Sequence, residues 1–510
     1  MCFAAVCPKA TARHSIFNDR KALIPTVLSG LRLSMSLARI GIRGAYFTSL
    51  ALGFRQVVSL LTTFYVARHL LPADIGLFSL VMIVIGLAQV VGDIGLAAGV
   101  VRSQNESPVV LSTAFWIGTS IGSMLSIVVY LLAPVAGNFY NNSDIVPFLR
   151  VSALGLLLNF LTPVPMALLQ QRLAYQQIAL SQSLGSISGA LAAGVIVTAG
   201  FGVWGLVFQP IIGNAISVLM MAYHAKWRPT FQFQFSAVRE IVHNGVHLLG
   251  SGVAGYLRNT FDVMVIGKSL PAQDLGMYGM AQTILYAPMH LITSTISRVI
   301  FPLLAKVQKD LGDIKRAVLT ATARTALLIF PLYFGLIILA DEFVFHVFGE
   351  NWLEMVPLIR IMATSFIVQS IGNVASPLML ALGKTKTIMN LSIAGTLFYF
   401  IVLLLLIPYG LTVVAIGYVT VNSSISIVSV IVALRHANIS LKSYLVTVLR
   451  PFILASIMGI AMIIVKYLSV SNELLYFLSE IFIGIFMYFI LVLIFEKNAL
   501  SQFISALKKA

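Results

Sequence analysis

The sequence has 510 residues, of which 59% are hydrophobic and only 10% are charged. A soluble globular chain carries about 25% charged residues, so this composition excludes an ordinary water-soluble protein and predicts that lipid is the main solvent. The net charge of +16 would indicate nucleic-acid binding in a soluble protein. In a membrane protein it indicates basic cytoplasmic loops beside anionic headgroups, and we therefore expect no nucleic-acid partner.

Apolar stretches long enough to cross a bilayer recur along the chain. A transmembrane helix needs about 20 predominantly apolar residues. The sequence therefore predicts an all-α polytopic membrane protein with about fourteen transmembrane helices. Their expected positions are 46–68, 75–101, 109–133, 146–169, 176–199, 202–225, 243–267, 275–304, 317–340, 354–381, 385–407, 411–434, 450–468 and 474–494.

Basic residues are distributed unequally between the two sets of loops that these helices define. Nearly all the loop lysines and arginines fall in one set and in the two tails, whereas the other set holds Arg68, Lys268 and Lys466. Cytoplasmic loops carry the excess of positive charge in membrane proteins. The alternation therefore predicts an even number of spans, with both termini in the cytoplasm.

A short motif occurs twice in the sequence. Leu-Pro-Ala, then Asp and Gly, then an aromatic residue lie within 68–78 and again within 268–278, with one inserted residue. A second match, between 147–150 and 357–360, keeps nearly the same offset. Six predicted helices separate the equivalent positions, so the copies share one orientation and predict two pseudo-symmetric lobes around a central crevice. The motif itself is explained more simply as a turn and helix start.

This repeat divides the chain into four expected parts. Residues 1–44 form a basic N-terminal tail, and 45–228 form the N-lobe with helices 1–6. Residues 229–436 contain a connector and the C-lobe with helices 7–12, and 437–510 contain helices 13–14 and a basic C-terminal tail. The longest loop, at about 225–242, is expected to be an amphipathic cytoplasmic connector between the lobes.

Ionisable residues inside the predicted spans need an explanation, because each costs about 2.5–3.5 kcal/mol on insertion scales. The arginines and acids that we take as candidates are Arg55, Arg258, Arg298, Arg360, Asp93 and Asp262. Asp93 is a candidate ion-coupling carboxylate, and a buried acid that packs between helices is the alternative. Arginine suits phosphate because its planar fork binds two oxygens at once, so the arginines predict an anionic ligand.

The predicted helices 243–267 and 275–304 each carry a polar stripe. The residues at spacings of three or four are His243, His247, Ser251, Gly255, Arg258 and Asp262, and then Tyr278, Gln282, Tyr286, His290 and Ser294. A polar stripe in a bilayer must face protein or water. In one interpretation the stripes line the crevice, Arg258 binds an anionic headgroup, and Asp262, Asn259 and Gln282 contact substrate. In the other, Arg258 and Asp262 form an intrahelical ion pair.

The sequence offers no pattern of a metal site, a cofactor site or a catalytic centre. His243 and His247 have metal-ligand spacing, but no acid or further ligand is nearby, and the two cysteines, Cys2 and Cys7, lie in the N-terminal tail. Residues 200–205 match GxGxxG only in their letters, because they follow no strand. We therefore expect no metal, no cofactor and no enzymatic activity.

Several short segments, within residues 45–435, resemble those of one transporter family. They are FDVMVIGKSL at 261–270, LGMYGMA at 275–281, DIGL at 93–96, WRP at 227–229, FGENW at 348–352 and LGK at 382–384. In these segments the chain is similar to Wzx-type, colanic-acid-exporter-like members of the polysaccharide transporter family. That family belongs to the multidrug/oligosaccharidyl-lipid/polysaccharide flippase superfamily.

The resemblance implies a flippase of the bacterial inner membrane that moves undecaprenyl-pyrophosphate-linked oligosaccharide, a repeat unit of exopolysaccharide or lipopolysaccharide, by alternating access. It also implies a cationic passage, an ion gradient as the driving force, and partners that include the lipid bilayer, a glycan polymerase and assembly machinery. Two alternatives stay open. A cation-coupled multidrug exporter would need an acidic cavity, and a membrane glycan polymerase or ligase would need catalytic groups in larger outward loops.

Overall fold

The computed structural model describes residues 51–103, 107–307, 310–466 and 473–496. Within these ranges the regular elements are helices, and none is a strand. After a helix at 51–69 come α2 (Pro72–Gly92), α3 (Leu96–Ser103), α4 (Pro108–Phe139), α5 (Ile145–Leu161), α6 (Pro163–Gln171), α7 (Tyr175–Ile196) and α8 (Trp204–Ala225). The later helices are α9 (Arg239–Ser269), α10 (Ala272–Val307), α11 (Leu311–Ile338), α12 (Ala340–Val347), α13 (Val356–Gly372), α14 (Ala375–Ala381), α15 (Thr385–Leu406), α16 (Leu411–His436), α17 (Leu441–Lys466) and α18 (Glu473–Phe495).

Eleven helical segments of the described chain are long and apolar enough to cross a bilayer. They are α2 with α3, α4, α5 with α6, α7, α8, α11, α13 with α14, α15, α16, α17 and most of α18. The three other predicted spans correspond to the helix at 51–69, α9 and α10. The predicted all-α polytopic fold is confirmed, and the count of fourteen spans stays a prediction.

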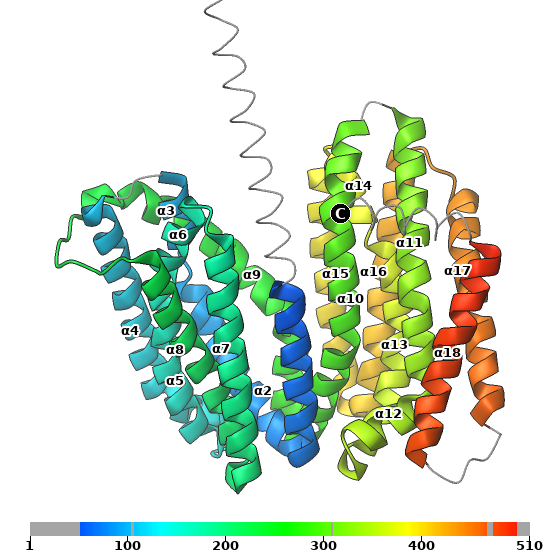
Figure 1. Ribbon diagram of the computed structural model, residues 1–510, viewed down its shortest axis with the longest axis horizontal. Coiled ribbons are helices and arrows are strands. Elements are labelled where there is room, and N and C mark those ends of the chain that lie inside the picture. Colours follow the sequence, from blue (N-terminus) through cyan, green and yellow to red (C-terminus); the bar gives the residue numbers. More distant parts are fainter. Residues whose placement is uncertain (1–50, 104–106, 308–309, 467–472, 497–510) are drawn as a thin grey trace, which may run out of the picture.

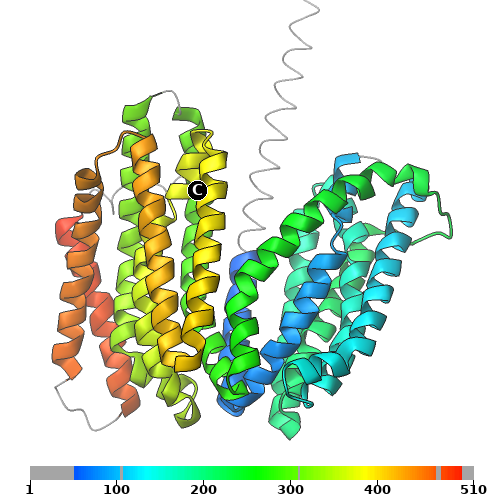
Figure 2. The same ribbon diagram turned by 180° about the vertical axis from the view of Figure 1, so that it is seen from behind.

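The helices form two bundles that lie side by side (Figure 1). The first contains α3 to α8 and the second contains α10 to α18, and α2 packs against α10 where the bundles meet. Seen from behind, α9 runs obliquely from the far end of the first bundle to this junction (Figure 2). It contacts α3 and α2 of the first half of the chain and α10 and α15 of the second, so α9 links the bundles.

The repeated sequence motif begins a helix in both places. Before α2, the backbone N–H of Leu71 donates to the carboxylate of Asp74 at 3.0 Å, and Pro72 occupies the first helical position. These are standard helix-start features. The N–H that proline lacks would have no partner at this position, and the negative charge of an acid in the first turn interacts favourably with the helix dipole. The second copy also has an acid, Asp274, in the first turn of α10.

The glycines of the two motif copies bring α2 and α10 into backbone contact. A Cβ atom on Gly76 would overlap the carbonyl group of Ala272, and one on Gly276 would overlap the carbonyl group of Pro72. The two contacts are reciprocal, so each copy of the motif packs on the start of the other. Only glycine permits such an approach, and the repeat therefore determines how closely the bundles meet.

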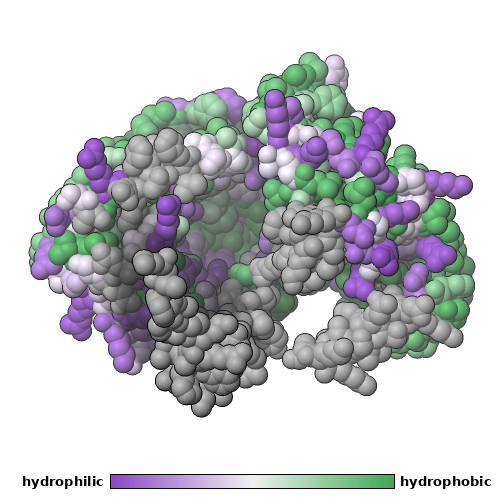
Figure 3. All heavy atoms as spheres, turned by 90° about the horizontal axis from the view of Figure 1, so that it is seen from above, coloured by the Kyte–Doolittle hydropathy of each residue, from purple (hydrophilic) through white to green (hydrophobic). Residues whose placement is uncertain are grey.

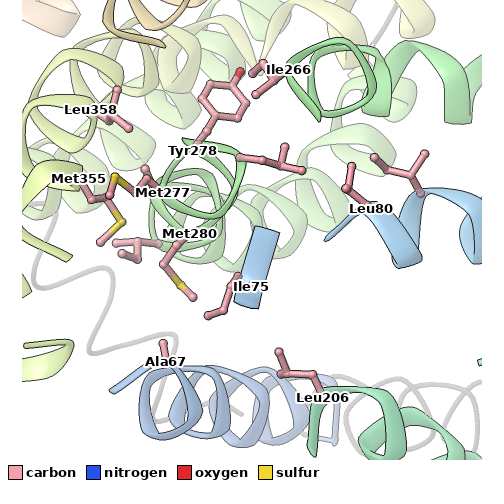
Figure 4. Close-up of a cluster of buried hydrophobic side chains, with 14 of the residues drawn as sticks. Ala67, Ile75, Leu80, Leu206, Ile266, Met277, Tyr278, Met280, Met355 and Leu358 are labelled. Atoms are coloured by element: carbon pink, nitrogen blue, oxygen red, sulfur yellow. The ribbon is translucent and has the colours of Figure 1, made fainter. Parts of the chain in front are cut away.

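Buried side chains seal this junction. Met280 points toward Ile75 of α2 in the close-up of the core (Figure 4), and both belong to the largest buried apolar cluster. The fully buried Trp352 donates its indole N–H to the carbonyl of Ala67 at 3.0 Å, and Arg68 donates to the carbonyl of His346. The end of the molecule at the bottom of Figure 1 is therefore closed.

The opposite end carries the basic loops. At that end α3, α6, α8, α14 and α16 finish and α9, α11, α15 and α17 begin (Figure 1). The basic residues at these helix ends and in the loops between them are Arg102, Arg172, Lys226, Arg228, Arg239, Lys315, Arg316, Lys384, Lys386, Arg435 and Lys442. Seen from this end, hydrophilic side chains gather near the rim and the molecule is hollowed between the bundles (Figure 3). The structure is therefore closed at one end and open toward the basic loops.

We expect Gly76→Ala and Gly276→Ala to destabilise this state, because each added methyl group displaces a backbone carbonyl and overpacking typically costs about 1–3 kcal/mol. The unfolding temperature of the purified protein in detergent checks this. Gly335→Ala in α11 is the matched control, since nothing lies within 4 Å of a Cβ there. Equal unfolding temperatures for all three variants and the parent would contradict the role given to the glycine contact.

Candidate functional site

A cavity of about 780 Å³ lies between the first bundle and the α9–α10 pair. Val66, Ile75 and Met280 contribute both to its lining and to the sealed core, so the cavity adjoins the closed junction. Its wall is rich in neutral polar groups. The amide and hydroxyl side chains are Gln56, Gln182, Gln209, Asn214, Gln282, Ser59, Thr62, Thr63, Ser79, Ser186, Ser217, Tyr256, Thr260 and Thr283.

One wall of the cavity is a single face of the helix at 51–69. On the helix at 51–69, Arg55, Ser59, Thr62 and Val66 recur at spacings of three or four and all line the cavity. The hydroxyl of Thr62 donates to the carbonyl of Val58 at 2.7 Å, so this polar group is satisfied within its own helix. This face therefore presents the guanidinium of Arg55 at one level of the cavity and the hydroxyl groups of Ser59 and Thr62 nearer the closed end.

Glycines let α7 and α8 form the neighbouring wall. A Cβ on Gly185 would overlap the side chain of Ser217, and one on Gly189 would overlap the carbonyl of Gln209. The two helices therefore pack almost backbone to backbone. The amide of Asn214 on α8 donates to the side-chain oxygen of Asn159 at 2.9 Å, which fixes its orientation.

Arg55 is the only Lys, Arg, Asp or Glu among the described residues that line the cavity. One terminal nitrogen of its guanidinium donates to the side-chain oxygen of Gln182 at 2.7 Å. Its Nε is buried and has no hydrogen-bond partner in the described structure. A guanidinium carries five N–H donors, so Arg55 retains donors beyond the one given to Gln182, and these suit an anionic ligand in the cavity.

Asp262 lies on α9 but does not line the cavity, and it is only 4% exposed. Its carboxylate accepts hydrogen bonds from the hydroxyl of Tyr278 and from the amide of Gln282, both at 2.8 Å. The buried hydroxyl of Tyr399 on α15 lies near the same carboxylate. Among the described side chains these partners are neutral. Because Gln282 also lines the cavity, it connects the cavity to the buried acid.

Arg258 and Asn259 are exposed on α9. Arg258 lies close enough to Tyr286 to interact with it electrostatically, and within the described ranges no ion pair joins Arg258 to Asp262. The intrahelical ion pair is thus not formed in this state. Neither Arg258 nor Asn259 contributes to the cavity lining, whereas Gln282 does.

The structure places the other candidate residues elsewhere. Arg360 pairs with Asp341 at the closed end, and the ammonium of Lys466 lies 3.6 Å from the same carboxylate. Asp93 is exposed at the end of α2, where its carboxylate accepts from the backbone N–H of Gly95 at 3.0 Å. Arg298 belongs to α10, but its side chain lies outside the described residues. Among the members of the predicted set whose side chains are described, only Arg55 and Gln282 line the cavity.

The polar residues of α7 and α8 were missed by the sequence interpretation. Gln182 and Ser186 are four residues apart, and Gln209, Asn214 and Ser217 fall on one side of α8. Their spacing was a usable signal. We overlooked this signal because ionisable residues were taken as the candidates within the spans, and these side chains are neutral.

The comparisons with known proteins agree on the family. The family model described as polysaccharide biosynthesis protein matches residues 65–357. Teichuronic acid biosynthesis protein TuaB of Bacillus subtilis (strain 168) is 26% identical over 379 residues, which are 73% of this chain and 78% of that protein. Lipopolysaccharide biosynthesis protein WzxC of Escherichia coli (strain K12) is 24% identical over 430 residues, which are 82% and 86% of the two chains.

Solved structures show the same fold. The lipid II flippase MurJ in an inward closed conformation superposes with a TM-score of 0.71, at 18% identity, over 89% of this chain and 99% of that one. An inward-facing multidrug resistance transporter of the MATE family, from the MOP superfamily, reaches 0.59 at 14% identity, over 77% and 98%. The resemblance to Wzx-type transporters is confirmed. With more than half of its length matched by the family model, this chain belongs to the family of polysaccharide biosynthesis proteins, whose members are membrane transporters and not enzymes.

Proposed function

We propose that this protein is a flippase that moves a lipid-linked oligosaccharide across the bacterial inner membrane by alternating access. The observation that carries the proposal is the chemistry of the cavity, whose described lining combines amides and hydroxyls with one arginine, in a molecule that is hollowed toward the basic loops (Figure 3). The names of the relatives and of the MurJ structure support the same class of cargo.

The cavity matches the part of such a cargo that lipid rejects. A headgroup of sugars and diphosphate cannot cross about 30 Å of hydrocarbon unaided, because its polar groups would lose their hydrogen bonds. Amide and hydroxyl side chains replace water around sugar hydroxyls, and the free donors of Arg55 suit a phosphate oxygen. The polyprenyl tail, which we propose to be undecaprenyl, stays in the surrounding lipid.

The same lining disfavours a multidrug exporter. Cationic drugs need an acidic cavity, and none of the described residues that line this one is Asp or Glu. Asp262, which accepts a hydrogen bond from the lining residue Gln282, is itself buried and is satisfied by neutral donors. The fold does not separate these two functions, because the MATE transporter shares it. The lining of the cavity is therefore the feature that favours a lipid-linked oligosaccharide over a cationic drug.

The charge asymmetry gives the proposed orientation. By the positive-inside rule the basic loops face the cytoplasm, so both termini are cytoplasmic and the present state is open inward. We propose that Arg258 and Asn259, which are exposed on α9, contact the headgroup as it enters. Substrate contacts of Arg298 and Arg360, and a partnership with a glycan polymerase and assembly machinery, stay predictions.

We further propose that Asp262 is the ion-coupling carboxylate. Asp93 was the candidate from the sequence, but it is exposed, and its carboxylate accepts a hydrogen bond from the backbone N–H of Gly95 in the turn after α2. Asp262 is a buried acid within the bilayer, surrounded by neutral partners, and such groups mark ion and proton pathways in transporters. Gln282 offers the route by which a ligand in the cavity changes the environment of Asp262.

We expect Arg55→Ala to reduce flipping about 10-fold or more, because a hydrogen bond to a charged group is worth about 1.5–3 kcal/mol. The measurement is the rate at which a fluorescent polyprenyl-diphosphate sugar crosses vesicles that contain the purified protein. Arg55→Lys should retain part of the rate, since it keeps the charge without the planar fork. Arg150→Ala is the control, because Arg150 stacks on Tyr130 outside the cavity. Equal rates for Arg55→Ala and the control would remove Arg55 from the site.

We expect Asp262→Asn to flip substrate slowly and without dependence on an imposed ion gradient, while its unfolding temperature stays near that of the parent. Asparagine keeps an oxygen that accepts from Tyr278, whereas Asp262→Ala leaves buried donors unsatisfied, at a cost of about 1–3 kcal/mol. The alanine variant should therefore lose stability as well as transport. A gradient-dependent Asp262→Asn variant would show that coupling lies elsewhere.

A further inference from the structure

The connector between α8 and α9 presents a row of exposed aromatic rings. Phe231, Phe233 and Phe235 are 95%, 60% and 50% exposed. Between them Gln234 has extended backbone angles, with φ −141° and ψ 98°. In an extended chain alternate residues point to the same side, so Phe233 and Phe235 flank Gln234 on one side. Phe231 stands two residues earlier, at a bend, and we call the three exposed rings the apolar edge. Isolated exposed apolar residues are ordinary, but three exposed rings within five residues of a polar segment indicate a contact surface.

Hydrogen bonds hold this segment against α4. The hydroxyl groups of Thr230 and Ser112 are 2.9 Å apart, and the indole N–H of Trp116 donates to the carbonyl of Thr230 at 2.8 Å. The backbone N–H of Gln234 donates to the hydroxyl of Thr113 at 3.0 Å. The apolar edge is therefore fixed in place on the first bundle.

The position of the edge corresponds to the border of the hydrocarbon layer. Phe231 stacks on Trp116, with ring centroids 5.5 Å apart and an angle of 17°. Beyond Trp116, the exposed apolar residues of α4 are Met124, Ile127, Val128, Tyr130, Leu131, Leu132, Val135 and Phe139. From Trp116 to Phe139 the helix rises roughly 35 Å, which is enough to cross a hydrocarbon core of about 30 Å with Trp116 at its border. Aromatic residues concentrate at this border in membrane proteins.

The charge of the segment fits an anionic surface. Lys226 and Arg228 precede the aromatic row, Arg239 follows it, and all three are exposed. Residues 226–239 contain no Asp or Glu. A polar segment with basic residues and exposed aromatic rings is typical of binding at the interface of anionic lipid.

We propose that residues 226–238 form an interfacial anchor that binds the headgroup layer on the side of the basic loops, with a preference for anionic lipids. Phe231, Phe233 and Phe235 enter the layer beside Trp116, and Lys226 and Arg228 contact lipid phosphates. Because α9 begins at Arg239, directly after the anchor, the first bundle is held at a fixed depth while α9 changes its tilt. The anchor does not depend on the identity of the substrate.

The test uses the full-length protein in vesicles. In a background with Cys2→Ser and Cys7→Ser, Ser236→Cys carries an environment-sensitive fluorophore beside the aromatic row. Lipids brominated at the upper acyl chain should quench this label strongly. The combined substitution Phe231→Ser, Phe233→Ser and Phe235→Ser should reduce quenching several-fold, and its unfolding temperature in detergent verifies that the bundle is intact.

The matched control, Gln232→Ser with Gln234→Ser, changes the opposite side of the same segment and should leave quenching unchanged. Adding phosphatidylglycerol to phosphatidylcholine should increase quenching in the parent, and Lys226→Gln with Arg228→Gln should remove that increase. The anchor is excluded if the serine variant of the aromatic row is quenched as strongly as the parent. It is also excluded if the label is shielded from brominated lipid but cross-links to another protein in native membranes, because the row then binds a protein.

Discussion

The approach of α2 and α10 at Gly76 and Gly276 is the constraint on which the rest of the structure depends. Because each glycine packs on the carbonyl at the start of the other helix, the bundles are pinned at one end and diverge at the other. The cavity lies directly above this contact, and its depth follows from it. The repeated motif is thus both a helix start, as its sequence indicates, and the contact between its own two copies.

A second constraint is that polar groups in the bilayer must find partners. The protein meets it in two ways on the two sides of α9. Toward the cavity, neutral amides and hydroxyls surround Arg55, which keeps unused donors. On the other side Asp262 is enclosed by tyrosines and Gln282. Among the described ion pairs none joins Arg55 to Asp262, so neither group is neutralised by the other, as the roles proposed for them require.

The sequence predicted the elements of the fold better than the contacts within the site. Long apolar stretches located nearly every helix, because the bilayer requires about 20 such residues. Arg55 was predicted because charge is rare in a span, and the structure places it in the cavity lining. The sequence did not show that Arg360 pairs with Asp341, because the two residues lie 19 positions apart and only the turn at α12 brings them together. Likewise, the sequence showed that Arg258 and Asp262 are four residues apart. It did not show that Tyr278 and Gln282 would donate hydrogen bonds to the carboxylate of Asp262.

The basic loops give the open end a property that the closed end lacks. Like charges repel by about 0.4 kcal/mol per pair at 10 Å in water before screening by salt, and both bundles carry several exposed basic side chains at the helix ends on this side. Any state in which this end is narrower must bring them closer together, so the empty protein resists closing there. An anionic headgroup between the bundles offsets that repulsion. In the proposed orientation and with the proposed cargo, the same basic residues that face the cytoplasm also favour closure around an anionic headgroup.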